Sequence, residues 1–96
     1  MEKKFYYNAL YDYYKELLTE KQQEYFEGYY FHDFSLGEIA DNESVSRNAV
    51  FTQVKIVLEK LDFYEEKLHL LENSQKIRSY IQDLDDEVKQ KIEELI

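Results

Sequence analysis

A set of polar and aromatic side chains between residues 46 and 55 has the types and the spacing to read a DNA duplex. The set consists of Ser46, Arg47, Asn48, Phe51, Thr52 and Lys55. On a helix these positions share one face, because residues three and four apart are neighbours. Arg47 can pair with a guanine edge and Asn48 with an adenine edge. Thr52 can meet a thymine methyl group or a phosphate, and Lys55 can meet a phosphate. The alternative is that all six are ordinary solvent-exposed residues of a scaffold that does not bind DNA.

The segments around this set predict the elements that position it. Residues 35–40 and 45–50 predict a short helix, a tight turn and a second helix. Ala40 is small where the second helix must cross the first, and Val45 and Val50 are expected to share a core between the two helices. This is the helix-turn-helix pattern, in which the N-terminal residues of the second helix contact base edges.

The charge of the chain argues against a simple DNA-binding role. The formal net charge is −9, and it divides into −3 for residues 1–34, −1 for residues 35–61 and −5 for residues 62–96. A duplex binder usually presents a positive face to the phosphates. Here Lys21, Arg47, Lys55 and Lys60 would have to supply most of the phosphate contacts. DNA binding by this chain therefore implies a homodimer, which doubles their number.

Composition predicts an all-α fold, a helix-turn-helix bundle with a long fourth helix and C-terminal helices. The chain has no proline and two glycines, and it is rich in residues that favour helices. Capping boxes are expected at Thr19 with Gln22 and at Ser35 with Glu38, and Ser46 is expected to cap the fourth helix. A break is expected at Asn73 and Ser74. The predicted helices cover about 5–18, 20–31, 36–42, 47–71, 75–82 and 86 onward, the last capped by Asp83 or Asp85.

An apolar seam with heptad spacing runs along the predicted fourth helix. Its members are Val50, Val54, Val57, Leu61, Tyr64, Leu68 and Leu71. We expect the first part to pack on the preceding helices. The later part, Val57, Leu61, Tyr64, Leu68 and Leu71, is predicted to form a homodimer interface. The alternative is an intramolecular seam covered by the two C-terminal helices. The chain accordingly divides into a helix-turn-helix core, residues 1–61, and a dimerisation region, residues 62–96.

The ten tyrosines and six phenylalanines have two interpretations. Most fall at helical core spacing within residues 5–31 and predict packing between helices. The alternative is a stacking platform for single-stranded RNA. Tyr7 and Tyr11 lie off the apolar stripe and fit either interpretation.

Several classes of protein are not expected from this sequence. No arrangement of residues typical of nucleophilic, acid–base or phosphate-binding catalysis is readable, so we predict a non-enzyme without cofactor, metal or small-molecule substrate. The only histidines, His32 and His69, are not placed together by any motif. No apolar run is long enough to cross a membrane, and no signal peptide is expected. With no cysteine, the chain fits a cytoplasmic location.

Five short motifs resemble the YlxM-like family of small bacterial helix-turn-helix proteins. They are L-T-E-K-Q at 18–22, Tyr29-Tyr30, S-L-G-E-I-A at 35–40, V-S-R-N-A-V at 45–50 and Y-E-E-K-L-H-L at 64–70. The resemblance covers about residues 5 to 72. The same residues are more loosely similar to region four of sigma factors, which binds promoter DNA through its second helix.

The resemblance implies a DNA-binding regulator associated with the signal recognition particle pathway, because the family's genes lie beside those of the particle's GTPase or its receptor. One residue departs from the pattern. Glu43 occupies a position that is normally apolar, and an unpaired buried carboxylate is costly. We therefore expect the first helix of the motif to end early or the turn to be remodelled. The alternative function is an acidic protein-interaction adaptor that binds a basic protein or a component of the particle without binding DNA.

Overall fold

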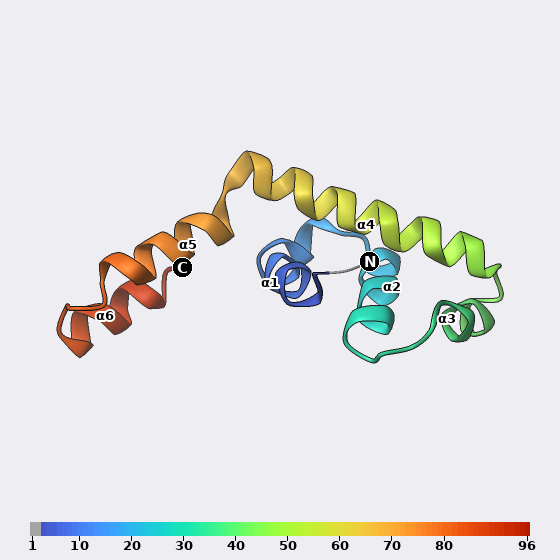
Figure 1. Cartoon of the computed structure of the whole chain (residues 1–96), viewed down its shortest axis with the longest axis horizontal. Coiled ribbons are helices and arrows are strands. Elements are labelled where there is room, and N and C mark those ends of the chain that lie inside the picture. Colours follow the sequence, from blue (N-terminus) through green and yellow to red (C-terminus); the bar gives the residue numbers. More distant parts are fainter. Residues whose placement is uncertain (1–2) are drawn as a thin grey trace.

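The computed structural model describes residues 3–96, and across this range all regular structure is helical (Figure 1). The elements are α1 (Lys4–Tyr14), a 3-10 turn η1 (Lys15–Leu17), α2 (Glu20–Tyr30), α3 (Leu36–Glu43), α4 (Arg47–Leu68), α5 (Leu70–Tyr80) and α6 (Asp86–Glu93). The prediction of an all-α helix-turn-helix fold is confirmed. Among the described residues, no helix is long and apolar enough to span a bilayer.

The predicted N-terminal caps are present, because each depends on residues only three apart. Thr19 Oγ1 accepts from the Gln22 amide at 3.1 Å, and the Gln22 side chain accepts from the Thr19 amide at 2.9 Å. Ser35 and Glu38 make the same reciprocal pair at 3.1 Å in both directions. Each cap satisfies amides at the start of a helix that have no intrahelical partner. Of the two candidates for α6, Asp85 is the cap.

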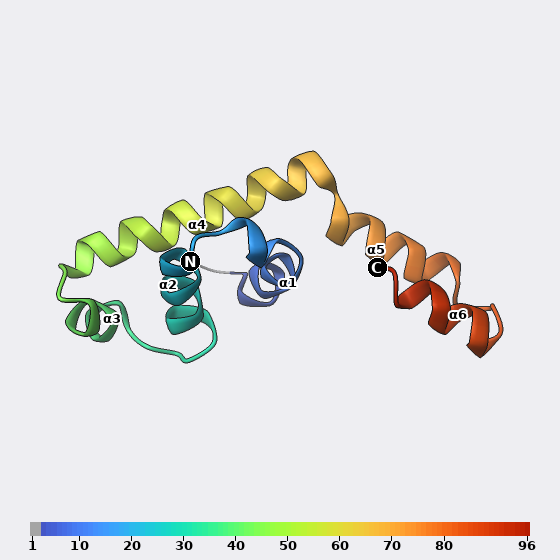
Figure 2. The same ribbon diagram turned by 180° about the vertical axis from the view of Figure 1, so that it is seen from behind.

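Most of the length of α4 lies across α3, α2 and α1, which together cover its apolar seam (Figures 1 and 2). Val50, Val54, Val57 and Leu61 are fully buried in this single-chain core. The prediction that Val57 and Leu61 lie in a dimer interface is therefore wrong, because no surface of either residue remains for a second copy. The alternative, a seam covered by α5 and α6, does not describe most of α4, because α4 packs mainly on α1, α2 and α3, although α5 also contacts it.

Stacked aromatic rings fill the space between α1 and α2. The ring centroids of Tyr11 and Phe26 are 4.2 Å apart, and those of Phe26 and Tyr30 are 4.6 Å apart. Tyr11 is buried, although the helical spacing left its role open, whereas Tyr6 and Leu17 are exposed. Because these rings stack on one another inside the core, they are not available to bases.

The break between α4 and α5 lies at His69, four residues before the expected position at Asn73 and Ser74. His69 has φ 57° and lies in the left-handed region, which for a non-glycine residue is held only by surrounding contacts. The break separates Leu68, which is exposed, from Leu71, which is buried on α5 where that helix meets α1. The heptad seam therefore does not continue past residue 68.

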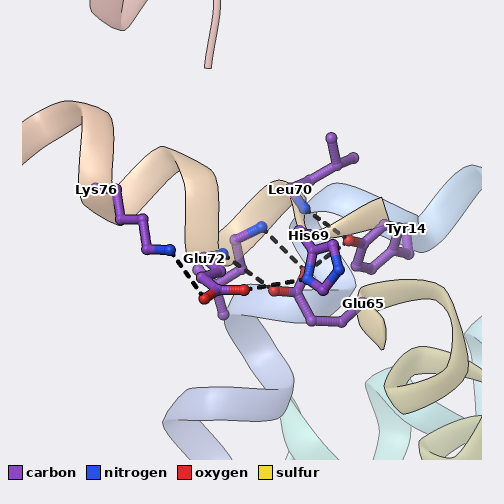
Figure 3. Close-up of polar contacts among 7 residues, drawn as sticks. Tyr14, Glu65, His69, Leu70, Glu72 and Lys76 are labelled. Atoms are coloured by element: carbon purple, nitrogen blue, oxygen red, sulfur yellow. Dashed lines mark hydrogen bonds and ion pairs between the residues drawn. The ribbon is translucent and has the colours of Figure 1, made fainter. Parts of the chain in front are cut away.

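A buried tyrosine and a carboxylate hold this joint (Figure 3). Glu65 Oε1 accepts from the Tyr14 hydroxyl at 2.6 Å and from the Leu71 amide at 3.1 Å, while Glu65 Oε2 accepts from the Glu72 amide at 3.0 Å. The Tyr14 oxygen in turn accepts from the Leu70 amide at 3.1 Å. Glu65 thus caps the N-terminus of α5, where a carboxylate also interacts favourably with the helix dipole.

Candidate nucleic-acid interface

The turn between α3 and α4 has the geometry that a helix-turn-helix requires. Ser44 ends α3 in the left-handed conformation at φ 55°, and the Val45 amide donates to the Ala40 carbonyl at 3.1 Å. This bond closes the end of α3 and starts the reversal of the chain. Ala40 is buried as expected, but Val45 is exposed and shares no core with Val50. The turn is therefore held by its backbone and by Ala40, not by an apolar contact from Val45.

Close contact with α2 fixes the position of α3. A Cβ atom on Gly28 would lie 3.4 Å from Cδ1 of Ile39 and 3.6 Å from Cδ2 of Phe34. A Cβ atom at residue 28 would thus be in ordinary van der Waals contact with these side chains, and a longer side chain would have to displace Ile39 or Phe34. Ile39 is buried in that contact, so α3 presents a defined surface beside the start of α4.

Glu43 lies at the end of α3 and is paired with Lys21 of α2. The expectation that α3 ends early or that the turn is remodelled was wrong, because α3 continues through Glu43 and the ion pair compensates the carboxylate. Hydrogen bonds to Glu43 and then Glu24 raise the pKa of the Lys21 ammonium. Lys21 is consequently engaged with two acids and is not a free phosphate ligand.

All six residues of the predicted recognition face are exposed on the N-terminal half of α4 or at its cap. Val50 and Val54, buried on the opposite side, set the rotation of the helix and turn this face outward. Ser46 Oγ accepts from the Ala49 amide at 3.0 Å, which confirms its predicted capping role. The Thr52 hydroxyl donates to the Asn48 carbonyl at 3.0 Å. Because this bond occupies the Thr52 hydroxyl proton, the methyl group is the part best suited to contact a base.

A shallow groove lies between the start of α3 and the start of α4. It is lined by Leu36, Arg47, Asn48 and Phe51, so an apolar floor lies beside two side chains that can donate hydrogen bonds. Sequence reasoning missed Leu36, which directly follows the capping residue of α3. Its apolar character next to a capping box was the only available signal. The groove adds a surface for apolar contact, of the kind that a thymine methyl group makes.

The cations near this face are few. Within residues 3–96, neither Arg47 nor Lys55 takes part in an ion pair. Lys60 Nζ lies 3.5 Å from the side-chain oxygen of Gln22. Of the four bases expected to contact phosphates, only Arg47 and Lys55 are therefore both exposed and free of a protein partner. The face can bind a polyanion, but one copy offers few contacts.

The histidines do not form a metal site with nearby acids. His69 Nδ1 lies 3.1 Å from Glu72, which also pairs with Lys76 at 3.2 Å (Figure 3). This arrangement stabilises the first turn of α5, and the Lys76 and His69 contacts lower the pKa of Glu72. In the part of the chain that the structure describes, no cluster of three or more potential ligands could hold a metal ion.

Comparison with known proteins gives a consistent set of relatives. A family model described as "Putative helix-turn-helix protein, YlxM / p13 like" matches residues 1–96. A UPF0122 protein of Halalkalibacterium halodurans is 48% identical over 81 residues, covering 84% of this chain and 74% of the relative. A UPF0122 protein of Geobacillus sp. (strain WCH70) is 45% identical over 91 residues, covering 95% and 83% respectively. A third, from Listeria monocytogenes serotype 4b, is 43% identical over 98 residues, covering 92% and 89%.

Proposed function

The chain belongs to the YlxM/p13-like family of helix-turn-helix proteins, and from that premise we propose that it is a non-enzymatic regulator that binds DNA through α4. The observation that supports this most directly is the outward face of α4. It combines two unpaired cations, Arg47 and Lys55, with Asn48 and an apolar groove. A regulator of this kind acts in the bacterial cytoplasm, where we place the protein.

The proposed contacts follow from the exposed groups of this face. Arg47 pairs with a guanine edge, and the Asn48 amide pairs with an adenine edge. Phe51 and the Thr52 methyl group meet thymine methyl groups in the major groove. Lys55, about two turns beyond Arg47 on the helix, contacts a phosphate and fixes the register of the helix on the duplex. The base sequence is read by Arg47, Asn48, Phe51 and Thr52. Most of the affinity is supplied by the cations.

The small number of free cations leads us to propose a homodimer. Each phosphate neutralised on a duplex contributes about −0.9 to the slope of log K against log salt. One copy in which Lys55 alone contacts a phosphate would therefore show a slope of only about −0.9, which is typical of weak binding. Two copies acting together would double the slope and the electrostatic part of the binding free energy. A dimer thus reconciles the motif with the acidic composition of the chain.

The proposal is tested by removing both free cations from the α4 face. The variant Arg47→Ala/Lys55→Ala is expected to bind genomic fragments at least about a hundredfold more weakly, with a shallower salt slope. The control is Lys15→Ala/Lys67→Ala, which changes the net charge equally at two exposed positions away from this face. If both variants bind like the unmodified protein, or lose affinity equally, α4 does not read DNA.

A second candidate function is favoured by the acidity of residues 62–96, which carry a net charge of −5. We propose as the alternative that this region docks a basic protein component of the signal recognition particle, because acidic surfaces steer association with basic partners. Retention of the purified particle protein at low salt, lost on salt addition, is the expected result. This alternative is abandoned if no particle component is retained even at low ionic strength.

A further inference from the structure

The C-terminal helices extend away from the core and leave the chain unusually elongated. In both views α5 and α6 lie at the opposite end of the molecule from α3 (Figures 1 and 2). The radius of gyration is 16.4 Å, and the principal extents are 53 × 25 × 22 Å. A compact domain of this length has a radius of gyration of about 12–13 Å. The hairpin of α5 and α6 therefore has much less protein around it than a folded domain normally provides.

The short helix α6 has no buried residue. Ile92 is partly covered, but Val88 is 42% exposed and Leu95 is 85% exposed. Val88 lies in α6, and Leu95 lies in the turn that follows its last residue, Glu93. Because Glu94 keeps helical backbone angles, the two side chains, seven positions apart, lie on about the same side. Leu84, at the turn between the helices, is also exposed and continues this stripe by four positions. Helices of this length are marginal on their own, so an apolar stripe left in water is an unexpected feature of a stable hairpin.

Three ion pairs compensate part of the charge of the hairpin. Lys91 pairs with Glu87 at 3.5 Å, and Arg78 of α5 approaches Glu93 of α6 at 3.8 Å. Lys76 and Glu72 make a third pair at 3.2 Å. Among the described residues, Asp83, Asp85, Asp86 and Glu94 take part in no ion pair, so acids are in excess beside the stripe. A second copy would therefore be held by apolar contact and not by charge complementarity.

We propose that the stripe formed by Leu84, Val88 and Leu95 docks a second copy of this chain. Two hairpins packed in this way form a four-helix bundle, the arrangement in which each helix covers its neighbours' apolar faces. With Tyr80, which is 76% exposed, the hairpin offers on the order of 500 Å² of surface, when roughly 150–250 Å² for each large side chain is multiplied by its exposed fraction. Two copies together reach about 1,000 Å², the lower bound for a specific interface.

This inference rests on the homodimer proposed above and gives it a location. The interface replaces the one expected at Val57 and Leu61, which the core has already buried. It also leaves the α4 face free, because α3 and the start of α4 lie at the far end of each copy (Figure 1). The joint at Glu65 and Tyr14 holds the hairpin in a fixed direction relative to that face.

The test is the oligomeric state of the full chain without DNA. Light scattering and sedimentation are expected to give twice the monomer mass of 11.8 kDa. The variant Val88→Glu/Leu95→Glu is expected to be monomeric, with its dissociation constant raised at least about a hundredfold. The control, Phe5→Glu/Leu17→Glu, adds the same charge at exposed apolar positions of α1 and η1 and is expected to remain dimeric.

A second measurement does not depend on the folding of the glutamate variant. The sequence has no cysteine, so Leu95→Cys and, separately, Phe5→Cys each provide a single site for a short bis-maleimide reagent. Efficient crosslinking at residue 95 but not at residue 5 is expected. A monomeric unmodified protein overturns both the homodimer and this interface. A dimer that survives Val88→Glu/Leu95→Glu, dissociates equally in the control, or crosslinks equally at both sites overturns the interface alone.

Discussion

Removing the Tyr14 hydroxyl is expected to loosen the joint between α4 and α5. In Tyr14→Phe, Glu65 loses the donor at 2.6 Å and the Leu70 amide loses its acceptor at 3.1 Å. A neutral hydrogen bond contributes about 0.5–1.5 kcal/mol to stability and one to a charged group about 1.5–3 kcal/mol. Leu70 is partly exposed, so water replaces some of the loss. We therefore expect the free energy of unfolding to fall by about 1.5–3 kcal/mol.

The assay for this prediction is reversible unfolding followed by circular dichroism. For a domain of this size, the expected loss corresponds to a drop in Tm of at least about 6 °C. The measurement is made at two protein concentrations, because a dimer becomes more stable as its concentration rises. The control is Tyr13→Phe, since the neighbouring hydroxyl makes no side-chain hydrogen bond among the described residues.

A double-mutant cycle sharpens the result. Glu65→Ala removes the acceptor for Tyr14 and for the amides of Leu71 and Glu72, and the loss of a helix cap alone costs about 0.5–2 kcal/mol. Because both substitutions delete the same Tyr14–Glu65 bond, their effects should be less than additive by about 0.5 kcal/mol or more, the smallest coupling that contacting residues show. Equal stability of Tyr14→Phe and Tyr13→Phe, or strictly additive effects in the cycle, would refute the assignment of this pair as the clamp of the joint.

The two glycines and the buried tyrosines supply the remaining predictions. Gly28→Leu should destabilise the chain by about 1–3 kcal/mol, because the new side chain meets Ile39 across the α2–α3 contact. Gly37→Ala should stabilise it by about 0.5–1 kcal/mol, since a Cβ there meets only Ser35 Oγ at 3.8 Å; thermal unfolding distinguishes the two signs. Burial, together in some cases with hydrogen bonds that the hydroxyl donates to a carboxylate, raises the pKa of five tyrosines. The pKa rises above its usual value for Tyr6, to about 12 for Tyr7, Tyr14 and Tyr30, and further for Tyr11. A raised pKa in the folded state means that stability is fully present below pH 10 and is lost as the pH rises from about 10 to 12. Tyrosinate absorbance should therefore rise together with the loss of helical signal, and ionisation of these groups without unfolding would contradict this prediction.

Features that depend on short stretches of sequence could be predicted without the structure. The all-α class, the capping residues Thr19, Ser35 and Ser46, and the turn between α3 and α4 all result from interactions between residues a few positions apart. For α6 the sequence left two candidate caps, Asp83 and Asp85, and the structure selects Asp85. The exposed face of α4 could also be predicted, because its helical period places Arg47 and Lys55 opposite buried valines. Local geometry alone is sufficient for these features.

Periodicity does not say which partner covers an apolar seam. The spacing of Val57 and Leu61 was compatible with a second copy, with the C-terminal helices or with the N-terminal helices, since any apolar surface satisfies it. The structure shows that α1, α2 and α3 cover this seam. The same limit applies to Tyr11, whose burial depends on the aromatic stack that α2 brings against α1.

Polar contacts between residues far apart in the sequence decided the turn at His69 and the pairing of the Glu43 carboxylate. The left-handed turn at His69 is held by Tyr14, which is 51 positions from its partner Glu65. The Glu43 carboxylate is compensated by Lys21, 22 positions away. What the sequence by itself determined is therefore the set of helices, their caps and the outward face of α4, because these depend on near neighbours. Only the tertiary structure decided where α4 ends, which lysine remains free for a phosphate and which apolar residues stay in water, because each depends on side chains that folding alone brings together.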